Sequence, residues 1–505
     1  MQNQAETVLT NEQILALIEL NKQVIEINKK QALQIEELKR QLAQYKKLIH
    51  GSKHERVEFI NPAQLTLDMG LGEITPVESF TEDIAYTRKK RERKAHPNRS
   101  PLPADLPREV IEIAPEEDIT GMKLIGHEIT EQLEMTPAKF YVKQYKRAKY
   151  ARPEGNGIAM GKLPVFALPK AIAGSSVLAH LLVSKYVDHL PLYRQIKMFS
   201  RIGMTLSDST VNDWIIGSVN LLTALHDRQT QLLLSSGYIQ NDETPIRVLD
   251  SEKKGQTHQG YFWVSHSPGQ KIVVFNYSKG RSAQFPTELF KDYRGYLQTD
   301  GYGVYDFFGQ KSNITLVGCM AHGRRYFIEA SGNDKKRSDY FIGKLQILYR
   351  LEETLRQENA SSEKVLAKRQ EIALPILQHL HQWLKENLTQ VLPQSAIGKA
   401  IGYALARWEK IMLYAQDGIL QIDNNLIENQ IRPVAVGRKN YLFCGSHESA
   451  QRAAIIYSLL GTCKLHNINP QDWLNDVLTK LPAYKANNID DLLPQNWKPN
   501  LQGVV

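Results

Sequence analysis

The stretch of residues 237–306 constrains the fold more than any other part of this 505-residue chain. Three runs rich in aromatic and β-branched residues predict strands: residues 237–249, 260–265 and 271–277. The tight connection at Gly269 and Gln270 predicts a hairpin between the second and third runs. Residues 282–290 predict a crossover helix, so that residues 295–299 return as a strand parallel to an earlier one.

Two aspartates lie on predicted strands of this pattern. Asp242 lies inside the first run, and Asp300 ends the returning strand. If the two strands are neighbours, their backbones are about 4.8 Å apart. Two carboxylates at that spacing repel each other, and a divalent cation removes the repulsion. The pair therefore predicts a metal site.

The length, charge and cysteine content set the class of protein. A chain of 505 residues is too long for one core, so we expect three or more domains. The three cysteines are widely spaced, which favours a reducing compartment and excludes a cysteine-based zinc finger. No secretory signal and no membrane-spanning apolar run are present, so we expect a cytoplasmic protein. The net charge of +9 permits a polyanionic partner without requiring one.

The N-terminal region, residues 1–56, predicts a coiled coil. Residues 10–49 contain no glycine or proline, and apolar residues alternate spacings of three and four along them. The pattern favours self-association into a homodimer or higher oligomer, and a helix packed on its own protein is the alternative. Residues 57–105 follow as a linker with a cationic run, which is either a solvated segment or a set of phosphate contacts: Arg88, Lys89, Lys90 and Arg91.

Two further units precede the strands. Residues 106–160 predict a small β-rich domain, in which the alternation over residues 140–150 indicates a strand with a basic outer face. Residues 161–232 are helical and have helix–turn–helix proportions, with Gly203 in the turn and Ser207 as a cap. A generic helical hairpin is the alternative. Three cations on the first helix favour DNA binding: Arg194, Lys197 and Arg201.

Residues 313–317 predict a fifth strand, and the motif Cys319-x-x-His322 follows it. No second pair of ligands lies near, so zinc is not expected there. Strand ends commonly face the ligand in an open α/β sheet, so His322 could orient an acid and Arg325 could hold the DNA backbone. The alternative is a core cysteine and histidine beside solvated arginines. Residues 337–415 predict long amphipathic helices.

Glu428 is the candidate third acid. Asn425, three residues before Glu428, suggests a helix-capping box, in which Glu428 would have only a structural role. Against it, apolar residues surround Glu428, and three cations that suit a site facing phosphates come next: Arg432, Arg438 and Lys439. Asp242, Asp300 and Glu428 could then hold two Mg²⁺ or Mn²⁺ ions for phosphoryl transfer on DNA.

The predicted fold is a multidomain α+β protein with a ribonuclease-H-like α/β catalytic core. That core spans residues 233–447, with the helical insertion at residues 337–415 between Asp300 and Glu428. A C-terminal helical domain, residues 448–505, completes the chain.

Several motifs in order carry a resemblance to a known family: Gly51-Ser-Lys-His-Glu-Arg56, Gln132-Leu-Glu134, Asp242-Glu-Thr-Pro245, Thr299-Asp-Gly-Tyr302, Cys319-x-x-His322-x-Arg-Arg325 and Asp423-Asn-Asn-x-x-Glu428. Together they resemble the DDE transposases of the insertion-sequence 66 family. The resemblance implies a bacterial, nucleoid-associated enzyme that cleaves and transfers DNA strands with magnesium at terminal inverted repeats. It also implies accessory proteins encoded by the same element.

One departure from the family concerns zinc. Relatives usually carry zinc-binding cysteines near residues 115–155, and this chain has none there, so a zinc-free domain is expected. Two alternatives to an active transposase stay open. One is a catalytically silent DNA-binding protein derived from a transposase, and the other is a related structure-specific DNA nuclease.

Overall fold

The structure is a computed structural model, and it describes residues 140–147, 149–151, 158–160, 162–169, 171–249, 255–310 and 313–499. The chain divides into two units, Met1–Asp68 and Met69–Val505, and all described residues belong to the second. The predicted coiled coil and the basic linker with Arg88, Lys89, Lys90 and Arg91 lie outside the described residues. Most of the small unit at residues 106–160 also lies outside them.

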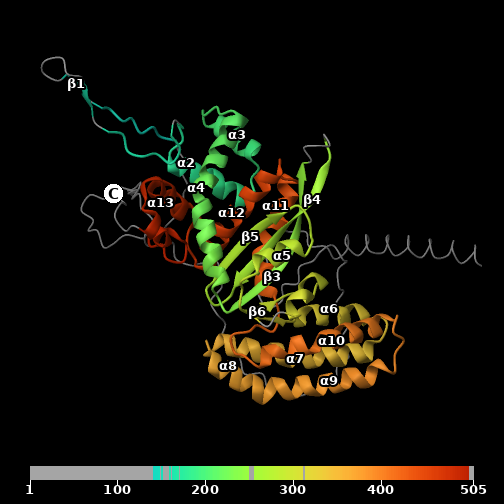
Figure 1. Ribbon diagram of the computed structural model, residues 1–505. Coiled ribbons are helices and arrows are strands. Elements are labelled where there is room, and N and C mark those ends of the chain that lie inside the picture. The colour runs from blue at the N-terminus through green and yellow to red at the C-terminus, as the bar shows by residue number, and fades with distance from the viewer. Residues whose placement is uncertain are drawn as a thin grey trace, which may run out of the picture. The chain divides into compact units, whose positions relative to one another are not determined.

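The centre of the second unit is a five-stranded mixed sheet in the order β5-β4-β3-β6-β7 (Figure 1). Its strands are β3 (Tyr238–Leu249), β4 (Thr257–Ser267), β5 (Ile272–Ser278), β6 (Gly295–Gln298) and β7 (Ile314–Val317). β3, β4 and β5 form an antiparallel meander, whereas β6 runs parallel to β3 and β7 parallel to β6. The crossover between β5 and β6 contains α5 (Gln284–Leu289). The predicted hairpin, crossover helix, return strand and fifth strand are therefore confirmed.

The two faces of the sheet are buried in different cores, because side chains alternate along a strand. Ile246 and Val248 of β3 join one hydrophobic cluster with α4 (Asp208–Leu234) and α12 (His447–Leu465). Ile239, on the opposite face, joins a second cluster under α5 and the 3₁₀ segment η4 (Gly303–Gln310). The central strand is thus covered on both sides.

The helices before the sheet are α2 (Ser175–Tyr186), α3 (Leu192–Arg201) and α4. The turn between α3 and α4 contains Gly203, whose φ of +88° favours glycine. The Ser207 hydroxyl accepts a hydrogen bond of 3.1 Å from the Thr210 amide and so caps α4. The predicted first helix, turn and cap are confirmed, α4 continues to Leu234, and the helix–turn–helix character of the pair stays a prediction.

The predicted helical insertion is confirmed as a layer of helices beside the sheet. Figure 1 shows α7, α9 and α10 lying side by side there, and they share a third hydrophobic cluster with α6. The helices that follow β7 are α6 (Met320–Ala330), α7 (Lys335–Gln357), α8 (Ser362–Lys368), the π-helical turn η5 (Arg369–Ala373), α9 (Leu374–Leu388), α10 (Ala396–Met412) and η6 (Leu413–Ala415). Arg369 and Glu352 form a buried ion pair of 2.7 Å inside the layer.

The last helices return to the sheet. They are α11 (Asn425–Tyr441), α12, α13 (Pro470–Lys480), η7 (Leu481–Ala483) and η8 (Ala486–Leu492). α12 packs on β5, where the Ser458 hydroxyl accepts a 2.7 Å hydrogen bond from the Phe275 amide. α2, α4, α12 and α13 contribute to one core with the sheet. The expected domain boundaries at residues 232 and 447 stay predictions.

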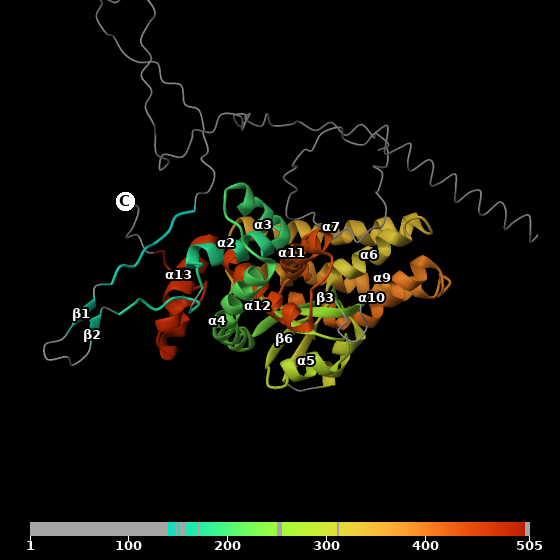
Figure 2. The ribbon, with the colours of Figure 1, turned by 90° about the horizontal axis from the view of Figure 1, so that it is seen from above.

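The strand predicted over residues 140–150 is largely wrong. Only β1 (Lys149–Ala151) pairs, with β2 (Ile158–Met160), and residues 140–147 belong to no strand. Alternation of side chains cannot by itself supply a neighbour for the backbone hydrogen bonds. Figure 2 shows this short ribbon extending away from α2. Among the described helices, none is long and apolar enough to cross a membrane.

Candidate active site

Asp242 lies on β3, and Asp300 lies two residues beyond the end of the neighbouring strand β6. The last residues paired between β3 and β6 are Gln240 and Gln298, and each aspartate follows two residues later. Parallel neighbours of a sheet are about 4.8 Å apart, so this register brings the two acids side by side. The expected pairing of β6 beside β3 is present, and the charge of Asp300 acts on Asp242.

Asp242 is surrounded by other acids. Its pKa is raised well above the usual range by burial and by the charges of Asp300, Glu243 and Glu428. Its Oδ1 accepts a hydrogen bond of 2.7 Å from the Glu243 amide, and Oδ1 of Asp300 accepts one of 2.8 Å from the Tyr302 amide. The negative charge of the neighbouring acids on Asp242 is thus only partly offset by the hydrogen bond from a backbone amide.

Glu428 faces the same region from the first turn of α11. α11 begins at Asn425, so Asn425 is its first helical residue and not its N-cap, and the capping box expected as the alternative is not formed. The side chain of Asn424, which is the N-cap residue, makes no capping hydrogen bond. Burial raises the pKa of Glu428, the cation of Arg325 opposes that rise, and the charge of Asp300 adds to it. Glu428 therefore lies between the aspartates and a group of cations.

A buried polar network beneath the acids ties the strands to α11. The Gln240 amide nitrogen donates to the Asp423 carbonyl at 2.9 Å and to Oε1 of Gln298 at 2.9 Å. The Gln298 amide nitrogen donates to the carbonyls of Gly318 and Gln421 at 3.0 and 2.9 Å. Our sequence interpretation missed these residues. The signal was present, because each aspartate follows a glutamine by two residues.

Cys319 and His322 connect the start of α6 to this site. Cys319 is 4% exposed, and its thiol donates to Oδ1 of Asn424 at 2.7 Å. Burial lowers the pKa of His322, whereas the negative charge of Asp300 opposes the lowering. Within the described residues, Nδ1 of His322 is buried and has no hydrogen-bond partner. Arg325 is exposed on the same helix, and its charge acts on both His322 and Glu428.

The insertion holds the turn that carries Asp300. The Tyr403 hydroxyl of α10 donates to the Asp300 carbonyl at 2.9 Å, and Arg407 donates to the Gly301 carbonyl at 2.9 Å. Gly301 has a φ of +84°, and a Cβ there would lie 2.4 Å from Nε of Arg407. Only glycine therefore fits between the acid and the insertion helix.

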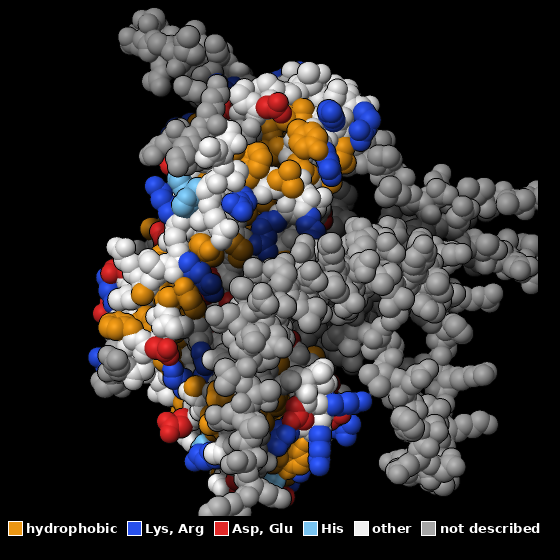
Figure 3. Space-filling view, turned by 90° about the vertical axis from the view of Figure 1, so that its right-hand side faces the viewer, with side chains coloured by type: hydrophobic (Ala, Val, Ile, Leu, Met, Phe, Trp, Pro, Cys, Tyr) orange, Lys and Arg blue, Asp and Glu red, His pale blue; other side chains and the backbone are white. Residues whose placement is uncertain are grey.

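The expected DNA-binding cations of the helix–turn–helix lie on a free face. Arg194, Lys197 and Arg201 of α3 are exposed, while Phe199 on the same helix is buried. Figure 3 shows Lys and Arg side chains among apolar ones near the top of the face it draws. On α3 the exposed large apolar neighbours are Tyr193 and Met198. A surface of cations and aromatic or apolar groups suits nucleic acid.

The cations after Glu428 differ from one another. Arg432 is half-buried, and its charge opposes the rise in the pKa of Glu428 that burial causes. Arg438 donates to the Pro245 carbonyl and so fastens α11 to β3. Lys439 is exposed. Of these three, Arg432 is the one whose charge acts on Glu428.

The arrangement of possible metal ligands is looser than in a preformed site. Within the part of the chain that the structure describes, no group of three or more His, Cys, Asp or Glu side chains is gathered closely enough to hold a metal ion. The carboxylates of Asp242 on β3, Asp300 beyond β6 and Glu428 on α11 nevertheless act on one another electrostatically, and carboxylate oxygens are the ligand type that Mg²⁺ prefers.

Comparison with known proteins gives consistent matches along the chain. Residues 170–452 match "Transposase IS66 family", residues 458–495 match "IS66 C-terminal element", and residues 37–111 match "Transposase C of IS166 homeodomain". The uncharacterized protein y4jD of Sinorhizobium fredii is 30% identical over 493 residues, which cover 92% of this chain and 96% of that protein. The uncharacterized protein y4qI of the same organism is 31% identical over 481 residues, covering 90% and 87%. The chain therefore belongs to the IS66 family of transposases.

Proposed function

We propose that this transposase binds the terminal inverted repeats of an insertion element and catalyses DNA strand cleavage and strand transfer with Asp242, Asp300 and Glu428. The observation that carries the proposal is that Asp242 and Asp300 each follow the last pair of the parallel strands β3 and β6 by two residues, while the charges of Asp300 and Glu428 both act on Asp242. Such a cluster of acids is costly in an ordinary core and useful where a cation binds.

We further infer that the sheet is a ribonuclease-H-like core. Support comes from the strand order, in which β3 is central, the meander β3–β4–β5 extends to one side and the parallel strands β6 and β7 extend to the other. The first acid is then on the central strand and the second on its parallel neighbour. The helical insertion lies between the second and the third acid in the sequence.

The three carboxylates would hold Mg²⁺ or Mn²⁺ through their oxygens, in agreement with the ligand preference of these ions. Two such ions, when bound, stabilise the attacking and leaving oxygens of a phosphoryl transfer. Arg325 and Arg432, whose charges act on Glu428, would offset the negative charge of the DNA backbone. Tyr403 and Arg407 would keep the Asp300 turn in place.

The experiment is a cleavage assay on DNA that carries the ends of the element encoding this chain. Purified protein with Mg²⁺ should cut at those ends, and Asp242→Ala should lose cleavage by about 100-fold or more while still binding the same DNA. Binding without cleavage by the wild type would favour a silent DNA-binding protein. Cutting of branched DNA regardless of the ends would favour a structure-specific nuclease.

A further inference from the structure

Arg281 reaches toward the catalytic acids from the loop between β5 and α5. Its Nε donates to Oε1 of Glu243 at 2.7 Å, and its guanidinium lies 3.9 Å from the centre of the Tyr302 ring. The charge of Asp300 also acts on Arg281. The Arg281 side chain is nevertheless 42% exposed, so this cation is fixed at the site and still open to solvent.

Glu243 is an unusual partner because it is inside the protein. Its side chain is 1% exposed and belongs to the face of β3 opposite to Asp242. Oε2 of Glu243 accepts a 3.0 Å hydrogen bond from the Tyr305 hydroxyl. That hydroxyl accepts from Nδ2 of Asn241 at 2.7 Å, and Oδ1 of Asn241 accepts from the Ser265 hydroxyl at 2.6 Å. This chain of hydrogen bonds fixes the carboxylate in position.

Packing alone does not explain a carboxylate at this place. Ile239 occupies the same face of β3 and contributes to the core there. A buried glutamate beside Asp242 adds repulsion, since its charge also raises the pKa of Asp242. The structure accepts this cost where the glutamate holds an exposed arginine. A guanidinium fixed by a carboxylate and an aromatic ring loses little conformational entropy when it binds a phosphate.

DNA needs such a cation here. The nearby acids Asp242, Glu243 and Asp300 repel a phosphate backbone that approaches the strand ends. An arginine has five N–H donors, and the contacts to Glu243 use Nε and Nη2. The remaining N–H groups of Arg281 can therefore bind a phosphate while the ion pair with Glu243 persists.

We propose that Arg281 binds a backbone phosphate of the DNA strand lying over Asp242 and Asp300, and that Glu243 is the positioning residue that holds Arg281 for this contact. The proposal rests on the proposed function, because it takes DNA as the ligand of the site. The competing explanation is that Arg281 only neutralises a buried glutamate.

The test is the salt dependence of binding to a mixed-sequence DNA duplex, measured without divalent ions. Arg281→Met should flatten the slope of log K against log salt by about 0.9, the value for one phosphate contact. Arg281→Met leaves Glu243 unpaired and can weaken folding, so the double variant Arg281→Met/Glu243→Gln removes both charges. If Arg281 contacts DNA, the double variant should fold like the wild type and keep the flattened slope. A wild-type slope in the double variant overturns the proposal.

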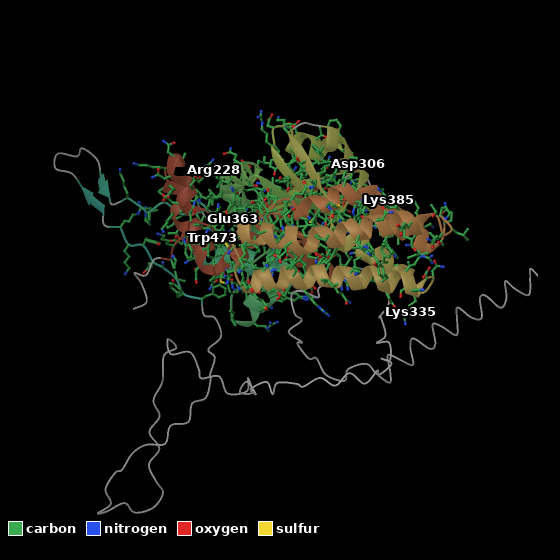
Figure 4. The ribbon with its side chains drawn as sticks, turned by 90° about the horizontal axis from the view of Figure 1, so that it is seen from below. Arg228, Asp306, Lys335, Glu363, Lys385 and Trp473 are labelled. Atoms are coloured by element: carbon green, nitrogen blue, oxygen red, sulfur yellow. The ribbon has the colours of Figure 1, made fainter. Side chains whose placement is uncertain are left out.

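A matched control is available in Arg228. It is 37% exposed and also pairs with a carboxylate, that of Asp490, at 2.6 Å. Figure 4 labels Arg228 apart from Asp306 of η4. Arg228→Met should leave the salt slope unchanged.

The role of Glu243 is tested separately. Glu243→Gln should keep the salt slope but weaken binding, and this weakening should vanish in the Arg281→Met background. Equal weakening in both backgrounds would reject the positioning role. The binding assay needs no cleavage, so a wild type that fails to cut DNA would reject the proposed function while the salt slope still decides the role of Arg281.

Discussion

Replacing Gln298 with methionine tests whether the polar network beneath the acids holds the site together. Gln298 is fully buried, and its amide nitrogen donates to the carbonyls of Gly318 and Gln421. Its Oε1 accepts from the Gln240 amide and the Tyr238 hydroxyl. Methionine has a similar length and can make none of these hydrogen bonds, so the substitution removes polarity with little change of shape.

The expected cost follows from the groups left without a partner. The carbonyls of Gly318 and Gln421 lose their Gln298 donor, and the O–H of Tyr238 loses its acceptor, although the Tyr238 oxygen still accepts from Gln240 and from the Gln421 amide. The Gln240 side-chain amide keeps the Asp423 carbonyl. An unsatisfied buried polar group costs roughly 1 kcal/mol or more, so the free energy of unfolding should fall by about 3 kcal/mol. Urea unfolding followed by circular dichroism measures this loss.

Cleavage should fall further than stability alone explains. Gln421 and Asp423 lead directly into α11, so loosening them shifts Glu428 relative to the aspartates. A misplacement of about 1 Å can cost roughly 100-fold in rate. Cleavage of element ends with Mg²⁺, at a temperature where the variant is folded, measures this effect.

Gln229 provides the matched control. It is also fully buried, and its amide nitrogen donates to the Val273 carbonyl, the Ser458 carbonyl and the Thr462 hydroxyl at 2.8, 3.2 and 3.0 Å. These contacts join α4, β5 and α12 rather than the acids. Gln229→Met should therefore lose similar stability and keep wild-type cleavage. Equal cleavage by the two variants would refute the idea that the Gln298 network positions the site.

Four further outcomes are expected. Glu352→Gln should lower the free energy of unfolding by about 3–5 kcal/mol because it leaves buried Arg369 without a counter-charge, while replacing both by apolar residues should be nearly neutral in urea unfolding. Burial lowers the pKa of His266 to about 4, and an unfolded histidine titrates near 6.5. The unfolded state then binds more protons between these values, so stability should fall as pH drops from about 6.5 to 4, and His266→Asn should flatten that dependence in denaturation curves. His322→Ala should reduce cleavage about 100-fold with DNA binding nearly unchanged. Wild-type cleavage by this variant would show that His322 is only a core residue. Leu38→Pro should break the predicted coiled coil, and an unchanged mass in light scattering would reject self-association there.

Much of the sheet could be predicted from the sequence because local patterns specify it. Runs of β-branched and aromatic residues marked β3, β4 and β5, and the crossover helix required a parallel return. The position of Asp300 at the end of that return then placed it beside Asp242. The strand expected at residues 140–150 failed because pairing needs a neighbour that alternation does not supply.

The contacts around the acids could not be predicted from the sequence. No sequence pattern links Glu243 to Arg281, because their contact joins β3 to a loop 38 residues later. Tyr403 and Arg407 lie more than a hundred positions beyond Asp300, on a helix whose amphipathic pattern predicts burial and nothing about its partner.

The sequence by itself determined the order of the elements and the membership in a transposase family, and it named the three acids that we propose as the site. Those properties depend on residue type and local spacing, which the chain carries directly. The tertiary structure decided which side of the sheet each neighbour of Asp242 faces, and that the insertion holds the Asp300 turn. It also decided that a buried glutamate holds an exposed arginine beside the acids. These features arise from packing between distant segments, which no local pattern records.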